Sequence, residues 1–241
     1  MTINTLGWAI ELLGEQIDLD DLREQLKSPY EPWIEDYQAD NGKILYLRSA
    51  SWDKLTEPND VIRDARRIIE QLNGEALLIH DDAHQVTLGQ VVKFDPAGNR
   101  NFYPITGHLH VTEGKDRARF RVVVGGTPKQ LQQSQMQRWF EEAETDDTRS
   151  ELFIHLGRMD NWYDFYKAAE LARRLAGGQN LLKATLGTED WKEWNRIWRT
   201  ANCYRHAPDP VKSPLPDNPA KLEDSIHFLL KTIRGILEVR V

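Results

Sequence analysis

The spacing of apolar residues changes near Thr127-Pro128, and this change constrains the fold more than any other feature of the sequence. Before this point, short segments alternate apolar and polar residues between turn signals, as β-strands do. After it, apolar residues recur every third or fourth position, as on one face of an α-helix. We therefore predict an α+β chain, with an N-terminal antiparallel sheet, one or two helices and then a C-terminal all-α helical bundle. The predicted domains span residues 1–128 and 129–241.

Turn signals divide the first domain into five or six expected strands. Asn41-Gly42 separates the first two alternating segments, and Asn-Gly is the strongest short-range hairpin signal. Beside the sheet, one amphipathic helix is expected to follow Pro58 and to end with a C-cap at Asn73-Gly74, and a shorter helix is expected over 19–26. The expected strands include residues 33–37, 44–47, 86–94, 101–111 and 117–124.

Helical periodicity continues through the second domain. The stretch 207–219 contains five prolines and interrupts it, because proline fixes φ and removes a backbone donor. We predict an ordered, extended connection there, between the last two helices. The expected helices cover residues 129–143, 147–157, 160–175, 188–203 and 219–238.

Composition excludes several classes of function. The formal net charge of the 241 residues is -7, and neither half of the chain has an excess of Lys and Arg, which argues against duplex-DNA binding. No apolar run approaches a membrane span and no signal peptide is evident, so we expect a soluble, cytoplasmic protein without a membrane partner. The single cysteine, Cys203, excludes an internal disulfide. No GxSxG, Walker, HExxH or GxGxxG motif occurs, and we expect no cofactor.

Histidines provide the weak candidates for a metal site. His108 and His110 flank one residue of an expected strand, so both imidazoles would point to the same face. His80 and His84 bracket two aspartates and offer further ligands. Because no third ligand at suitable spacing is evident, we interpret these residues as surface polar groups and predict no metal. The tryptophans at 191, 194 and 198 share one helix face, where core packing is favoured over an aromatic ligand groove.

The segment RTANCYRHAPDP, residues 199–210, is the main candidate for chemistry. A histidine that titrates near neutral pH beside arginines suits acid–base work on a phosphodiester, with Arg199 and His206 as the central pair. Asn202 and Arg205 would be secondary contacts. Alternatively, Arg and His compensate the helix dipole at a C-terminus, and Asn202 and His206 fasten the Pro-rich connection. On residue chemistry alone, the structural alternative is favoured.

Two resemblances bear on this segment. The pattern TAN...RH, followed by a Pro-rich stretch, an NP and a final helix, resembles a group of uncharacterised bacterial and phage proteins over roughly residues 160–240. The helices also resemble the HEPN superfamily of helical-bundle nucleases, whose motif is an Arg and a His with four to six residues between them. Six residues separate Arg199 from His206, and Thr200 stands where that superfamily commonly has Asn. The HEPN resemblance implies metal-independent RNA cleavage, with the Arg and His of two protomers meeting across a dimer interface.

Two hypotheses for function follow. The first is a non-catalytic interaction or regulatory protein of a bacterial or phage system, with a HEPN-like helical domain and with a protein partner or a second copy of itself as its ligand. The alternative is a HEPN-like ribonuclease of a phage-defence or mobile-element system that uses Arg199 and His206; RNA is then the partner. The sequence favours the first hypothesis narrowly.

Overall fold

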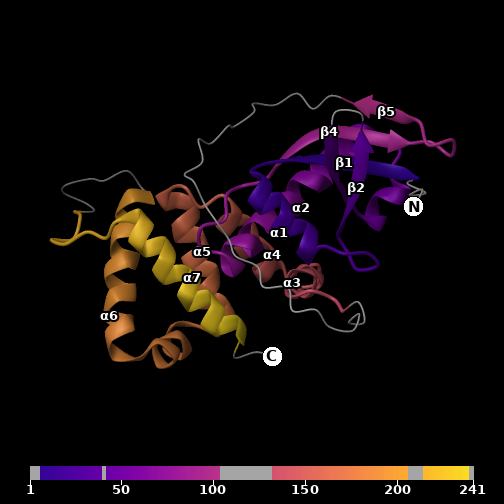
Figure 1. Cartoon of the computed structure of the whole chain (residues 1–241). Coiled ribbons are helices and arrows are strands. Elements are labelled where there is room, and N and C mark those ends of the chain that lie inside the picture. The colour runs from indigo at the N-terminus through magenta and orange to yellow at the C-terminus, as the bar shows by residue number, and fades with distance from the viewer. Residues whose placement is uncertain (1–5, 40–41, 104–131, 206–213, 239–241) are drawn as a thin grey trace, which may run out of the picture. The chain divides into compact units, whose positions relative to one another are not determined.

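A computed structural model describes residues 6–39, 42–103, 132–205 and 214–238 of the chain (Figure 1). The chain divides into two compact units. The first unit comprises Met1–Ile69 and His84–Glu141, and the second comprises Glu70–Ala83 and Glu142–Val241. The predicted boundary at residue 128 lies outside the described residues. The predicted fold class is confirmed: a five-stranded antiparallel sheet with helices is followed by C-terminal helices.

The sheet has the order β2-β3-β1-β4-β5, and every neighbouring pair is antiparallel. The expected hairpin at Asn41-Gly42 is confirmed by register, since Ala39 lies opposite Gly42. The expected strand over 117–124, and most of the strand over 101–111, lie outside the described residues. The strands are β1 (Gly7–Leu13), β2 (Trp33–Ala39), β3 (Gly42–Arg48), β4 (Thr87–Phe94) and β5 (Arg100–Tyr103).

The central strand β1 was not predicted. Its residues Trp8, Ala9 and Ile10 are consecutive and all buried, so the apolar–polar alternation of a half-exposed strand is missing. A strand with neighbours on both sides and both faces covered needs apolar side chains on each face. Burial on both faces therefore removed the alternation signal from β1. β3 also has consecutive buried residues, but the Asn-Gly turn signal beside it identified that strand.

Helix α1 (Gln16–Gln25) and a short 3-10 helix, η1 (Ala50–Lys54), belong to the first unit. Helix α2 (Pro58–Ile79) begins at Pro58, slightly before the predicted start, and continues through Asn73-Gly74, so the predicted C-cap there is wrong. The reason is that Gly74 lies against the backbone of a second helix, where a side chain has no room. The first part of α2, to Ile69, belongs to the first unit, and the rest belongs to the second.

Five further helices follow the sheet, and α4 to α7 pack on one another through α5 (Figure 1). The expected helix over 147–157 is confirmed, with Asp146 as its N-cap, and α5 is capped by Asn161. α7 begins three residues later than predicted. The helices are α3 (Gln135–Ala143), α4 (Asp147–Gly157), α5 (Trp162–Leu175), α6 (Gln179–Arg205) and α7 (Leu222–Glu238). None of the helices in the described ranges is long and apolar enough to cross a membrane.

Helix α6 consists of two helical parts that meet at Gly187. This residue has φ 72° and ψ -176°, a combination that is essentially restricted to glycine. The second part, after Gly187, corresponds to the predicted helix over 188–203. The first part was not predicted, because Leu182 is its only buried side chain and a single apolar contact makes no periodic pattern.

Candidate functional site

The candidate segment RTANCYR forms the last two turns of α6, which ends at Arg205. Helical residues three and four apart lie on one face, so the buried side chains Trp194, Ile197 and Ala201 mark the core side of the helix. Arg199 is exposed, and Asn202 is half-buried. His206 lies outside the described residues.

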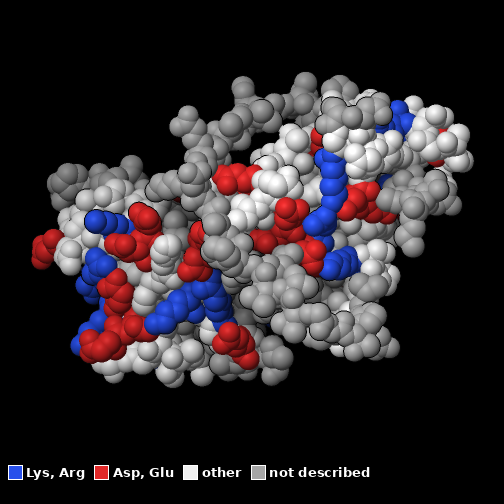
Figure 2. All heavy atoms as spheres, in the orientation of Figure 1, with Lys and Arg blue, Asp and Glu red and all other residues white. Residues whose placement is uncertain are grey.

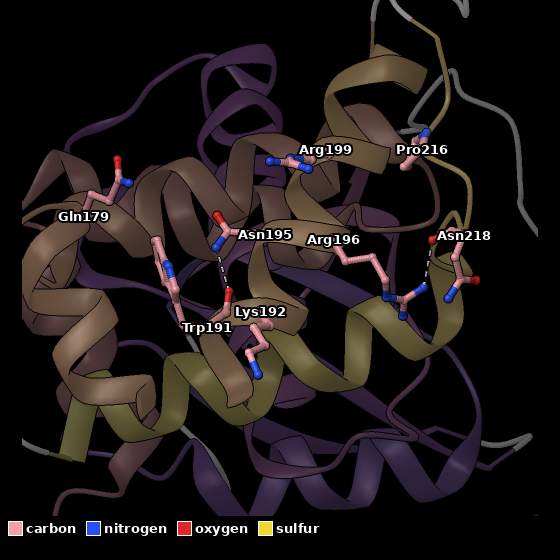
Figure 3. A pocket seen from close by; sticks show the side chains of 8 residues that line it. All are labelled: Gln179, Trp191, Lys192, Asn195, Arg196, Arg199, Pro216 and Asn218. Atoms are coloured by element: carbon pink, nitrogen blue, oxygen red, sulfur yellow. Dashed lines mark hydrogen bonds between the residues drawn. The ribbon is translucent and has the colours of Figure 1, made fainter. Parts of the chain in front are cut away.

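Arg199 lies at the wall of a pocket of about 540 Å³ in the second unit (Figure 3). Lys192, Asn195 and Arg196 come from the same helix and precede Arg199 by seven, four and three residues, which places all four side chains on one face. Among the described residues that line the pocket there is no carboxylate or imidazole. The lining is completed by Gln179 and Trp191 of α6 and by Pro216 and Asn218 of the connection before α7.

Glutamates on the same helix compensate two of the three cations. Lys192 Nζ lies 2.7 Å from a carboxylate oxygen of Glu189. Arg196 donates from Nε to Glu193 at 2.8 Å and makes a second bond to the same carboxylate. This pairing lowers the pKa of Glu193 and raises the pKa of Arg196. Arg199 makes no hydrogen bond or ion pair to any described residue, so it is the uncompensated cation of the pocket.

The polar residues of the lining are available for binding to different degrees. Asn195 donates its amide to the Trp191 carbonyl at 2.8 Å and keeps its own oxygen as an acceptor (Figure 3). Arg196 also donates from Nη1 to the Asn218 carbonyl at 3.4 Å. The pocket therefore presents one open guanidinium beside amide groups and the half-buried ring of Trp191.

The other two predicted site residues do not line this pocket. The Arg205 guanidinium lies over the ring of Tyr166, 4.0 Å from its centroid, in a cation–π contact. Asn202 is half-buried on α6 and is absent from the pocket wall. Within the described part of the chain, the structure therefore separates Arg199 from both predicted secondary contacts.

The connection before α7 is fastened to α6 by residues other than Asn202. Thr200 accepts a hydrogen bond from the Ala220 N–H at 3.1 Å and donates to the Arg196 carbonyl at 3.0 Å. The Cys203 thiol donates to the Pro214 carbonyl, with 3.4 Å between sulfur and oxygen. Thr200 and Ala220 are both buried, so their bond satisfies groups that water does not reach. Thr200, where the HEPN pattern commonly has Asn, thus has a structural role.

Core packing was predicted for the tryptophans at 191, 194 and 198. The prediction is confirmed for Trp194 and needs correction for Trp191. Trp194 is buried, as expected of a core residue. Trp198 is half-buried and packs on Tyr166, with 4.7 Å between ring centroids. Trp191 instead lines the pocket. The sequence contained one signal for this pocket that the prediction did not use. This signal is the helical spacing of Lys192, Arg196 and Arg199, which places the three cations on one face.

The predicted metal candidates His108 and His110 lie outside the described residues. Elsewhere, in the first unit, the structure brings together Glu15, Asp18 and His84, with one ligand atom of each within 4.8 Å of the others. Of the four histidines considered from sequence, His84 thus meets carboxylates of another segment.

Comparison with known proteins identifies no relative: no protein-family model, no curated protein and no solved structure matches this chain.

Proposed function

We propose that this protein is a non-catalytic interaction protein whose Arg199 pocket receives an acidic group of a protein partner. One observation carries the proposal: the Arg199 guanidinium is exposed at the pocket and has no partner among the described residues. A guanidinium offers five N–H donors in a planar fork that matches a carboxylate through two parallel bonds. The side chain is therefore suited to pair with an acidic side chain or a C-terminal carboxylate.

The charge balance of α6 favours an acidic protein group over an RNA strand. Glu189 and Glu193 already compensate Lys192 and Arg196, which leaves Arg199 as the cation of the pocket without a partner among the described residues. RNA carries a charge on every nucleotide, and its binding gains most from several phosphate contacts. On the side drawn in Figure 2, basic and acidic side chains are intermixed over the helices rather than gathered in a basic track. A single carboxylate matches the available charge better.

Binding of a fluorescein-labelled hexaglutamate peptide, followed by fluorescence anisotropy, tests the proposal. We expect Arg199→Ala to weaken binding by about 10-fold or more, because a charge-assisted hydrogen bond contributes about 1.5–3 kcal/mol. Arg174→Ala, which removes an exposed arginine of α5 that is not in the pocket wall, is the matched control and should bind like the wild type. Equal affinity of the Arg199 and Arg174 variants would contradict the proposal.

Ribonuclease activity is the second candidate, because an exposed Arg199 with no ionic partner among the described residues is also what a phosphodiester-cleaving site needs. Under this alternative Arg199 stabilises the developing charge and His206 moves the proton, with the two residues supplied by the two protomers of a dimer. Labelled single-stranded RNA is incubated with the protein in EDTA. Cleavage by the wild type that is lost in both His206→Ala and Arg199→Ala would establish this activity. If RNA stays intact in every case, the ribonuclease alternative is excluded.

A further inference from the structure

Three potential metal ligands meet beside the start of α1, in the first unit. Glu15 is the residue before the helix, Asp18 lies in its first turn, and His84 precedes β4. The His84 Nδ1 atom lies 2.6 Å from a Glu15 carboxylate oxygen, and the His84 backbone N–H donates to Asp18 Oδ1 at 3.3 Å. Both the backbone and the side chain of His84 therefore bind residues at the start of α1, although at least 66 positions separate them in the sequence.

The spacing of the ligand atoms fits a small divalent ion after a modest adjustment. One atom from each of the three side chains lies within 4.8 Å of the other two. Bonds of about 2.0–2.2 Å to nitrogen and oxygen place the ligands of one tetrahedral ion roughly 3.3–3.6 Å apart. Rotation of the long Glu15 side chain, which is 30% exposed, supplies a change of this size. The buried Asp18 needs no movement of its backbone.

Charge and donor type both favour a cation with affinity for nitrogen. With a neutral imidazole, the group carries two carboxylate charges, and that of Asp18 is only 4% exposed. A divalent ion balances both charges. Mg²⁺ and Ca²⁺ prefer oxygen ligands alone, whereas one imidazole with carboxylates suits Zn²⁺ and neighbouring first-row ions.

We propose that Glu15, Asp18 and His84 form a binding site for a divalent transition-metal ion of the Zn²⁺ class. His84 binds through Nδ1, with its proton on Nε2, and each carboxylate contributes one oxygen. His84 and Glu15 are partly exposed, with 32% and 30% of their side chains accessible, so solvent reaches the ion. Three protein ligands with a position open to water distinguish this site from a closed four-ligand structural zinc site. The site is independent of the Arg199 pocket.

The proposal is tested by titrating Zn²⁺ into EDTA-treated, desalted full-length protein and following the heat of binding. We expect one strong site in the wild type, and an affinity at least about 10-fold lower in His84→Gln and in Glu15→Gln. Mg²⁺ should not compete with Zn²⁺. Substituted Co²⁺ should give visible absorption bands that the two variants lose. Both altered residues are partly exposed, and circular dichroism of each variant verifies its fold.

The matched control is His155→Gln. His155 Nδ1 lies 2.8 Å from a carboxylate oxygen of Asp164, so this pair resembles His84–Glu15 but lacks a third ligand among the described residues. The His155→Gln variant should therefore bind Zn²⁺ like the wild type. The proposal is overturned if the wild type has no strong site, or if His84→Gln retains it. A loss of thermal stability in His84→Gln that is the same with and without Zn²⁺ would assign the group to hydrogen bonding alone.

Discussion

Gly74→Ala is expected to destabilise the second unit by about 3 kcal/mol or more. A Cβ on Gly74 would lie 2.0 Å from the Phe153 carbonyl oxygen, and one on Gly157 would lie 2.1 Å from the Glu70 carbonyl oxygen. The two glycines thus form a reciprocal contact between α2 and α4. Because both obstacles are backbone atoms, no side-chain rotation relieves the clash, and the helices must separate and lose packing.

The measurement is urea unfolding followed by circular dichroism and by hydrogen exchange of the α4 and α5 amides, which reports on this unit directly. Gly235→Ala is the matched control. Gly235 also lies inside a helix, α7, but a Cβ there meets nothing within 4 Å. Alanine at that position should stabilise the protein by about 0.5–1 kcal/mol through helix propensity. If the two alanine variants change stability alike, the glycine contact between α2 and α4 does not have the structural importance argued for it.

Glu75→Met is expected to increase stability at pH 7 by about 1–3 kcal/mol. Glu75 lies in α2, next to Gly74, with no exposed surface, and neither carboxylate oxygen has a hydrogen-bond partner among the described residues. Burial raises the pKa of this carboxyl well above its ordinary value. Folding at neutral pH therefore requires an uncompensated polar group to leave water, and methionine has similar length without that cost.

The same substitution should also change how stability depends on pH. Because the pKa of Glu75 is higher in the folded than in the unfolded chain, the folded state binds the proton more tightly. The stabilisation that the folded protein gains from this tighter proton binding is complete below the ordinary pKa of 4.5. It is lost as pH rises from there toward the raised pKa. The stability difference between Glu75→Met and the wild type should therefore grow with pH across that interval.

Urea unfolding at several pH values checks this prediction. Glu151→Met removes an exposed glutamate from α4 and is the control, for which the difference from the wild type should stay nearly constant with pH. A Glu75→Met variant that is less stable than the wild type at every pH would indicate that the carboxyl has a partner, and the argument from its isolation would be wrong.

The accuracy of the sequence predictions followed the kind of packing that each element has. Elements with one buried and one exposed face, such as β2 and α4, were predicted because their apolar residues recur with the period of the element. β1, buried on both sides, was missed. Asn73-Gly74 was misinterpreted because a glycine in a helical sequence can mark either the end of the helix or a close contact with another helix. The position of α4 beside Gly74 shows that the second role applies here.

The candidate site shows the same division. Arg199 was selected from its residue type and its position near a helix end, and the structure places it at a pocket. Its neighbours Lys192 and Arg196 lie within the same helix and were available from spacing, whereas Pro216 and Asn218 come from a separate segment. Arg205 was assigned to the site by its proximity in sequence, but the ring of Tyr166, from another helix, provides its contact.

Local periodicity and turn chemistry were enough to establish that an antiparallel sheet is followed by helices, because these signals arise within a few neighbouring residues. The tertiary structure alone decided which polar groups are compensated. In the part of the chain that the structure describes, Arg199 has no ionic partner, Glu75 has no hydrogen-bond partner, and Glu15 and Asp18 meet His84 from a distant segment. The physical reason is that desolvation and ion pairing depend on distances in space, and residues far apart in the chain acquire those distances only when it folds.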